Sequence, residues 1–112
     1  MDRPRVSEAT RHAFEQIAEG LVAEAGAKQG QMMGMPTLYF GGKAFAGVFG
    51  EAMVFKLEGG VHAAALAHPG AALFDPSGRG RPMKAWVRVP TAGSSAWSRL
   101  AAQALEAVRA AS

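Results

Sequence analysis

Three apolar stretches follow one another closely in this chain and are separated only by glycine-containing pairs. The stretches are residues 37–40 (TLYF), 43–48 (KAFAGV) and 52–57 (AMVFKL), and the pairs between them are Gly41-Gly42 and Gly50-Glu51. Glycine readily adopts the positive φ angles of a two-residue hairpin turn. The first pair therefore predicts a tight hairpin, the second predicts another turn, and the segment as a whole predicts three consecutive antiparallel strands.

A two-residue turn at Gly41-Gly42 also predicts the register of its hairpin. The expected pairs are Phe40 with Lys43, Tyr39 with Ala44 and Leu38 with Phe45. Because successive side chains of a strand point to opposite faces, both faces of this sheet carry large apolar groups. Helices are expected to cover one face, and the other face needs a partner subunit, a ligand or another chain segment as its cover.

The flanking segments predict three helices and two further strands. Ser7 is the expected N-cap of a first helix, and apolar residues then recur at helical spacing up to Gly26. We expect a loose arm over residues 1–6, a polar loop after the first helix, an alanine-rich helix over 61–68, strands over 71–74 and 83–89, and a final helix from about residue 95. The predicted order is α-β-β-β-α-β-β-α, an α+β fold. In the last strand, alternation groups Met83 with Val87 and puts Trp86 on the opposite side.

Composition narrows the class of protein. A chain of 112 residues, 49% of them hydrophobic, is expected to form a single domain over residues 1–112. It has no cysteine, which excludes disulfides, thiolate metal ligands and cysteine nucleophiles. Its apolar runs are too short for a transmembrane helix and its N-terminus has no signal-peptide pattern, so we expect a cytoplasmic protein that does not associate with membranes.

Charge is distributed unevenly along the chain. The net charge is +3, but residues 1–58 carry six basic and seven acidic residues, whereas residues 59–112 carry six basic and two acidic residues. The basic excess therefore lies in the C-terminal half, which permits an anionic partner without requiring one.

The basic excess is concentrated in the segment DPSGRGRPMKAWVRVP, residues 75–90. The candidates for binding nucleic acid or another anion are Arg79, Arg81, Lys84 and Arg88. Trp86 would then stack on a base. The alternative is a solvated loop followed by a structural strand, in which Trp86 packs on the sheet and the basic side chains reach water around it. Gly78 and Gly80 suggest an anion-cradling loop, but no helix N-terminus follows them directly, so the phosphate-loop mechanism has no support.

Two lysines on otherwise apolar strands form a second candidate site, for a ligand or an interface. In the predicted register Lys43 shares a face with Phe40 and Phe45, and Lys56 lies near the end of the third strand. An apolar surface with one cationic point suits a small acidic ligand. The alternative is that both lysines flank turns and keep their ammonium groups in water.

No pattern in the chain specifies a reaction. The histidines are His12, His62 and His68, and the last two are six positions apart, which does not place two metal ligands on one helical face. No serine has the strand-turn-helix context of a hydrolase nucleophile. We therefore expect no catalytic residue, no metal, no cofactor and no enzymatic activity.

Several short motifs follow one another in a characteristic order. They are Met33-Gly34, LYFGGKAFAGV with Lys43, Phe45 and Ala46, MVFKL with Lys56, then Phe74, GRGRPM with Met83, Trp86, Pro90 and Trp97. In this order and spacing the chain resembles, over residues 32–110, the N-terminal domain of the TfoX/Sxy regulators of competence. It departs from the family pattern where Met33 replaces an aromatic residue and Gly41 replaces the usual aspartate.

The resemblance implies a two-layer α+β domain, akin to secretion chaperones, with helices on one face of an antiparallel sheet of about five strands. It places the strand over residues 83–89 inside the sheet. It also implies a small stand-alone member without the TfoX C-terminal domain, a non-catalytic binding or regulatory module linked to transcription. Such a module would act through a homodimer or a protein partner. Nucleic-acid binding through residues 79–88 and binding of a small acidic ligand are the alternatives.

Overall fold

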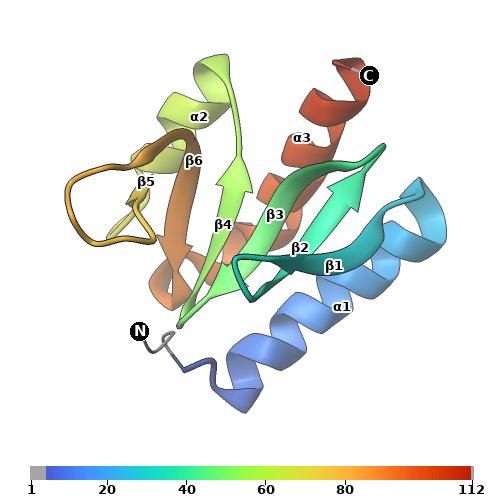
Figure 1. Cartoon of the computed structure of the whole chain (residues 1–112), viewed down its shortest axis with the longest axis horizontal. Helices are drawn as coiled ribbons and strands as arrows, with labels where there is room; N and C mark the ends of the chain where they lie inside the picture. The colour runs from blue at the N-terminus through green and yellow to red at the C-terminus, as the bar shows by residue number, and fades with distance from the viewer. Residues whose placement is uncertain (1–4, 112) are drawn as a thin grey trace.

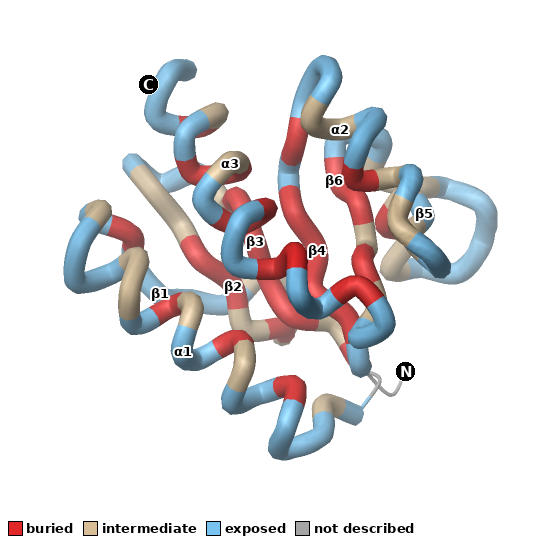
Figure 2. Tube along the Cα trace, turned by 180° about the vertical axis from the view of Figure 1, so that it is seen from behind, coloured by how far each residue is buried: buried red, intermediate tan, exposed pale blue. Residues whose placement is uncertain are grey.

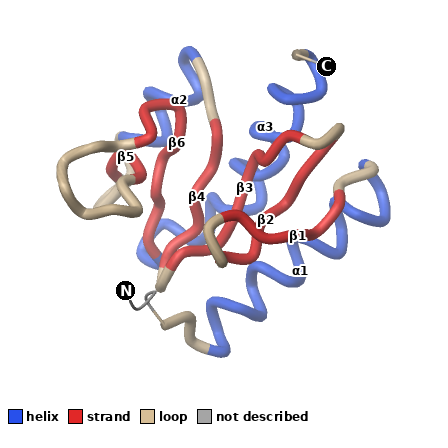
Figure 3. Tube along the Cα trace, viewed as in Figure 1, coloured by secondary structure: helices blue, strands red, loops and turns tan. Residues whose placement is uncertain are grey.

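The computed structural model describes residues 5–111 of the chain. Within them, three α-helices pack behind a six-stranded antiparallel sheet (Figure 1). The strands are β1 (Lys28–Met32), β2 (Met35–Phe40), β3 (Lys43–Phe49), β4 (Ala52–Lys56), β5 (Ala72–Phe74) and β6 (Met83–Pro90). The helices are α1 (Glu8–Ala25), α2 (Gly59–Leu66) and α3 (Trp97–Ala110), and a 3₁₀ helix over Thr91–Ala96 precedes α3. The strands lie in the order β1-β2-β3-β4-β6-β5 (Figure 3). The predicted α+β fold class is confirmed.

The sheet has one strand more than expected. Residues 28–32 (KQGQM) lack apolar alternation, and the sequence predicted a polar loop there. They form β1, which pairs along its whole length with β2. As an exposed edge strand, β1 buries too little side-chain surface to leave a pattern in the sequence. β6 lies between β4 and β5, inside the sheet, as the resemblance implied.

A β-bulge corrects the predicted register of the hairpin between β2 and β3. The two pairs next to the turn form as predicted, but Ala46 rather than Phe45 lies opposite Leu38. A bulge inserts one extra residue into one strand, and the turn sequence alone does not specify it. As a result, Phe45 and Ala46 both pack into the core beneath the helices.

A second irregularity changes the side on which Met83 packs. Phe74 pairs with Met83 directly after Leu73 pairs with Val87, so the register between β5 and β6 shifts at this point. Met83 therefore packs beside Trp86 and not with Val87, which corrects the prediction from simple alternation.

The main core lies between the sheet and the helices. Figure 2 shows the buried parts of β2, β3, β4 and β6 facing α1 and α3. Trp97 anchors the start of α3, since it is 1% exposed and its indole N–H donates to the carbonyl of Val89 at 3.0 Å. The arm predicted over residues 1–6 lies mostly outside the described residues, and Val6, which is described, packs against this core. No helix among residues 5–111 has the length and apolar character needed to cross a bilayer.

Glu51 ties the start of α1 to the turn between β3 and β4. Its carboxylate accepts hydrogen bonds from the N–H of Ser7 at 2.6 Å, from Ser7 Oγ at 2.8 Å and from Thr10 Oγ1 at 2.5 Å. These bonds, with that of Thr10 the largest cause, hold the pKa of Glu51 below its usual 4.5. Ser7 also accepts from the N–H of Thr10, which confirms the predicted N-cap.

The sheet face that the helices leave free has a buried cluster of its own. We name Met35, Val54, Phe74 and Trp86 the outer cluster, and each of these side chains is at most 6% exposed. Half-buried apolar residues from β1, β3 and β6 pack around it, namely Met32, Ala44, Phe49 and Met83. Every strand therefore contributes, and β1 crosses in front of the sheet in Figure 1. The large apolar side chains on this face are therefore buried by side chains of the chain's own strands.

Gly47 makes room for this packing, because it lies between Thr37 and Val54 in the sheet. A Cβ at this position would lie 2.8 Å from Met35 Cε and 2.9 Å from the carbonyl oxygen of Pro36. We expect Gly47→Ala to lower the free energy of unfolding by about 1–3 kcal/mol through overpacking, as measured by urea denaturation.

Gly60→Ala is the matched control for this substitution. Gly60 lies in α2, and a Cβ there would meet no heavy atom within 4 Å. Alanine is the better helix former, so this variant should be more stable by about 0.5 kcal/mol. Equal effects of the two substitutions would contradict the tight packing of the outer cluster.

Candidate functional site

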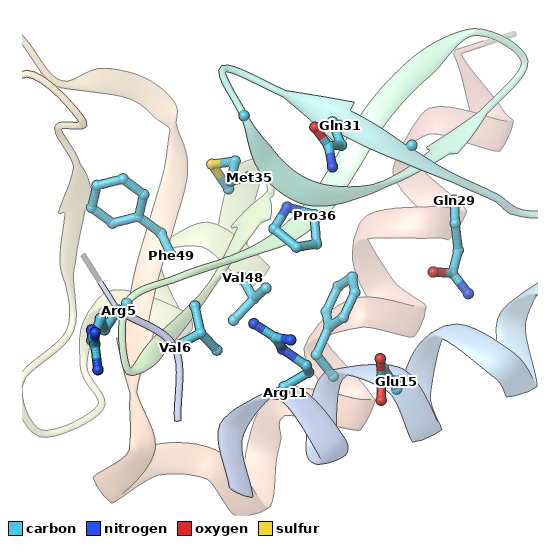
Figure 4. Close-up of a pocket in the computed structure, with 14 residues that line it drawn as sticks. Arg5, Val6, Arg11, Glu15, Gln29, Gln31, Met35, Pro36, Val48 and Phe49 are labelled. Atoms are coloured by element: carbon cyan, nitrogen blue, oxygen red, sulfur yellow. The ribbon is translucent and has the colours of Figure 1, made fainter. Parts of the chain in front are cut away.

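A groove lies between α1 and the hairpin of β1 and β2 (Figure 4), and we name it the α1–β1 groove. Its volume is about 760 Å³. Polar side chains of Arg5, Arg11, Glu15, Gln29 and Gln31 line it, and its apolar residues include Val6, Phe14, Pro36 and Val48. In Figure 4, Gln29 and Gln31 extend from β1, and Arg11 and Glu15 extend from α1, into the same space.

The groove results from the way the hairpin and α1 are held apart. Met32 and Met35, on either side of the turn between β1 and β2, pack with the outer cluster and so pull the tip of the hairpin toward the helix-free face. Glu51 meanwhile fixes the start of α1 on the opposite side of the sheet. The space between these two anchored elements is the α1–β1 groove.

Within residues 5–111, no charged group of the α1–β1 groove takes part in an ion pair. The ion pair found among the described residues joins Arg109 to Glu106 on α3, away from the groove. Arg5 and Arg11 are exposed and give the groove two positive charges against the single negative charge of Glu15. Sequence reasoning missed this site because it depends on β1, and the polar run Gln29-Gly30-Gln31 was its only signal.

The glycine-rich turn between β5 and β6 is folded around Asp75. Its Oδ1 accepts from the N–H groups of Ser77 and Gly78, both at 3.1 Å, and its Oδ2 accepts from those of Gly80 at 2.8 Å and Arg81 at 3.1 Å. Positive φ angles at Gly78 (68°) and Gly80 (77°) turn these amides inward. The turn is therefore an anion cradle that is occupied by the chain's own carboxylate.

Hydrogen bonds shift the acidity of Asp75. Ser77 Oγ donates to Oδ1 at 2.7 Å and is the largest cause that lowers the pKa of Asp75 below its usual 3.8, with the backbone N–H groups adding to it. Asp75 thus remains charged at neutral pH. Arg79 and Arg81 lie exposed on the outside of the turn that it holds.

The strand after this turn carries the other candidate residues. Lys84 is exposed and Arg88 is half-buried. Arg88 pairs with Val54, and Lys56 pairs with Trp86, so both cations lie on the side of the outer cluster. Trp86 is 6% exposed, which confirms that it packs on the sheet, and its ring is not available to stack on a base.

The sheet and the first helix carry opposite charge. The six strands hold five basic residues and no acidic residue, namely Lys28, Lys43, Lys56, Lys84 and Arg88. In contrast, α1 holds four glutamates and one arginine. The basic side of the domain is therefore the sheet together with the turn that carries Arg79 and Arg81.

Lys43 and Lys56 do not form one site. Lys43 lies at the helix side, where its Nζ is 3.5 Å from the carbonyl oxygen of Ala111, beyond the end of α3. This is a favourable position for a cation, because carbonyl groups point outward at the C-terminus of a helix. Lys56 is on the other face, opposite Trp86.

The two aromatic residues predicted beside Lys43 have different surroundings. Phe45 is fully buried in the main core, and Phe40 is half-buried with the guanidinium of Arg109 5.8 Å from its ring centroid. Neither lysine lines the α1–β1 groove or a second cavity of about 390 Å³ between α2 and α3. Binding of a small acidic ligand gains no support from these two cavities.

The histidines are dispersed over the fold. His62 on α2 lies with its Nε2 2.8 Å from the carbonyl oxygen of Lys84, which joins α2 to β6. In the described part of the chain, no three histidine, aspartate or glutamate side chains gather as a metal site would require.

The Asp75 turn leads to a prediction about pH and local stability. The pKa of the Asp75 carboxyl group is lower in the folded protein than in the unfolded chain. The stabilisation by its carboxylate is therefore complete above the unfolded pKa of about 4. This stabilisation is lost as the pH falls through the folded pKa. At neutral pH, Asp75→Asn should imitate this loss, because an amide nitrogen cannot accept a hydrogen bond. We expect faster hydrogen exchange of the Gly80 and Arg81 amides, measured by NMR.

Ser77→Ala serves as the control for Asp75→Asn. It removes one hydroxyl donor but leaves the carboxylate and the backbone amides that bind it. The Gly80 and Arg81 amides should stay protected in this variant. Equal protection in the wild type and in Asp75→Asn would show that the carboxylate does not hold the turn.

No protein-family model matches this chain, and neither does any curated protein or solved structure. The resemblance to TfoX N-terminal domains therefore rests on the sequence motifs alone.

Proposed function

We propose that this chain is a non-catalytic binding domain of the TfoX N-terminal type, with a regulatory role exerted through a protein partner. The observation that supports this most is the α1–β1 groove. It combines apolar side chains, two exposed arginines and an exposed edge strand in one concave surface. Concave surfaces with an apolar lining and a few polar groups are typical recognition sites. The sequence motifs add the link to transcription regulation, and a cytoplasmic location fits that role.

Two carboxylates hold the parts of the chain that flank the candidate binding surfaces. Glu51 holds the start of α1, and Asp75 holds the basic turn. In both, hydrogen bonds to the carboxylate lower the pKa. Both groups thus have structural tasks.

A second candidate function is nucleic-acid binding by the basic turn and β6. It is favoured by the charge separation between the basic sheet and the acidic α1. The residues that would contact phosphates are Arg79, Arg81, Lys84 and Arg88, and none of them forms an ion pair with another described residue. Because Trp86 is packed on the sheet, this binding would be electrostatic and would not include base stacking.

Site-specific crosslinking in the cells that express the protein tests the first proposal. A photoreactive amino acid at Gln29, in the groove, should form a discrete adduct with a partner protein. The same amino acid at Ala102, exposed on α3, is the control and should not form this adduct. The proposal fails if both positions give the same products, or if Gln29 gives none and the purified protein stays monomeric.

Salt dependence tests the second candidate. Binding to fluorescent DNA and RNA oligonucleotides should weaken steeply as KCl is raised, and each of Arg81→Ala and Arg88→Ala should flatten the log-log slope by about 0.7–0.9. Arg99→Ala, on the exposed face of α3, should leave the slope unchanged. No binding at low salt, or identical slopes for all variants, would exclude this function.

A further inference from the structure

β1 is at the edge of the sheet, so one of its sides has no partner strand among residues 5–111. The hairpin turn that follows it, Met33-Gly34, has positive φ at both residues (53° and 78°), the geometry of a two-residue type I′ turn. In such a turn the flanking residues, Met32 and Met35, form a hydrogen-bonded pair. Since hydrogen-bonded and non-hydrogen-bonded pairs alternate, the backbone N–H and C=O groups of Gln29 and Gln31 point away from β2.

A side-chain contact agrees with this assignment. The carbonyl oxygen of Gln31 accepts a hydrogen bond from the hydroxyl of Tyr39 at 2.7 Å, as expected for a carbonyl that has no partner in the neighbouring strand. The Tyr39 ring reaches this oxygen across Gly30, where a Cβ would be only 3.0 Å from the ring. Two backbone N–H groups, those of Gln29 and Gln31, and the carbonyl of Gln29 therefore remain available along the free edge.

This free edge lies next to the α1–β1 groove. The side chains of Gln29 and Gln31 extend into the groove (Figure 4), so a strand added to β1 would place alternate side chains there too. They would meet the apolar Phe14 and the two unpaired arginines, Arg5 and Arg11. The excess of positive charge favours carboxylates at those positions.

We propose that an extended, acidic segment of a partner protein binds by adding as a strand to β1, with a carboxylate side chain between Arg5 and Arg11. This inference rests on the proposed function and specifies the chemistry of the partner. Main-chain hydrogen bonds to Gln29 and Gln31 supply affinity, and the arginines select acidic sequences.

A second copy of the chain is a poorer occupant. Antiparallel pairing of β1 with its own copy would set two α1 helices side by side on the same face of the joined sheet. Each helix carries four glutamates and one arginine, so the two would repel each other. An acidic peptide has no such second helix and finds the opposite charge at Arg5 and Arg11.

Fluorescence polarisation with a labelled heptapeptide, Thr-Val-Glu-Val-Glu-Val-Thr, tests the proposal. It should bind more tightly, by about tenfold, than the same peptide with lysine in place of glutamate. Arg11→Gln should reduce this preference, while Arg99→Gln on α3 should not. Equal affinity for the two peptides would overturn the charge-based part of the proposal.

The strand pairing is tested by Gln31→Pro. Proline removes the outward N–H and is tolerated on edge strands when that N–H does not belong to the ladder. We expect about tenfold weaker peptide binding than in the control Gln31→Ala, which keeps the N–H but loses the same side chain. Circular dichroism checks that both variants fold. Equal affinity of Gln31→Pro and Gln31→Ala would overturn strand addition.

Backbone N-methylation of the peptide gives an independent test that leaves the protein unchanged. In a strand added to β1, the N–H groups of every second peptide residue point toward β1, and those of the residues between point away. N-methylation of the first set should weaken binding about tenfold, and N-methylation of the second set should not. Equal effects of both sets would also overturn strand addition. A dimer of the protein that Gln31→Pro dissociates would assign the edge to a second copy instead.

Failure of this inference can be told apart from failure of the proposed function. If the partner still crosslinks at Gln29 but neither Gln31→Pro nor Arg11→Gln weakens the adduct, the strand-addition proposal fails and the protein-binding role stands. If no partner crosslinks at Gln29 and no peptide binds, both fail.

Discussion

The sheet has to bury apolar side chains on both faces, although the helices cover only one of them. The chain meets this requirement on the helix-free face with the outer cluster of Met35, Val54, Phe74 and Trp86, around which half-buried residues of β1, β3 and β6 pack. Met32 and Met35 pack with this cluster at the tip of the β1–β2 hairpin, and the groove lies between this hairpin and α1. The candidate binding surface is thus a consequence of the burial of apolar side chains on the helix-free face.

The parts of the fold that could be predicted are those set by local chemistry. Ser7 marks the start of α1, and the glycine pair at residues 41 and 42 makes the hairpin turn. In β4, Met53 and Phe55 face the main core and Val54 faces the outer cluster, as expected for a strand with two apolar faces. β1 was missed because a polar edge strand forms only when β2 offers it backbone partners. The bulge at Phe45 and the shifted side of Met83 depend on packing between distant segments.

The candidate site shows the same division. The exposure of Arg79 and Arg81 and the packing of Trp86 could be anticipated from glycine content and alternation. The α1–β1 groove could not be anticipated. One of its walls is β1, and the sequence pattern does not predict this strand. From the sequence, Arg11 is one more charged residue on the solvent-facing side of a helix. Only the position of β1 shows that Arg11 lines a groove.

The shape of the turn around Asp75 is determined by hydrogen bonds within the turn itself. Its hydrogen bonds span six positions at most and involve no residue of the helices or of the other strands. The turn is therefore modular, and the side chains at positions 79 and 81 can change without cost to the fold. Over evolution, or in the laboratory, substitutions in this loop can change the charge of the domain surface while the fold stays the same.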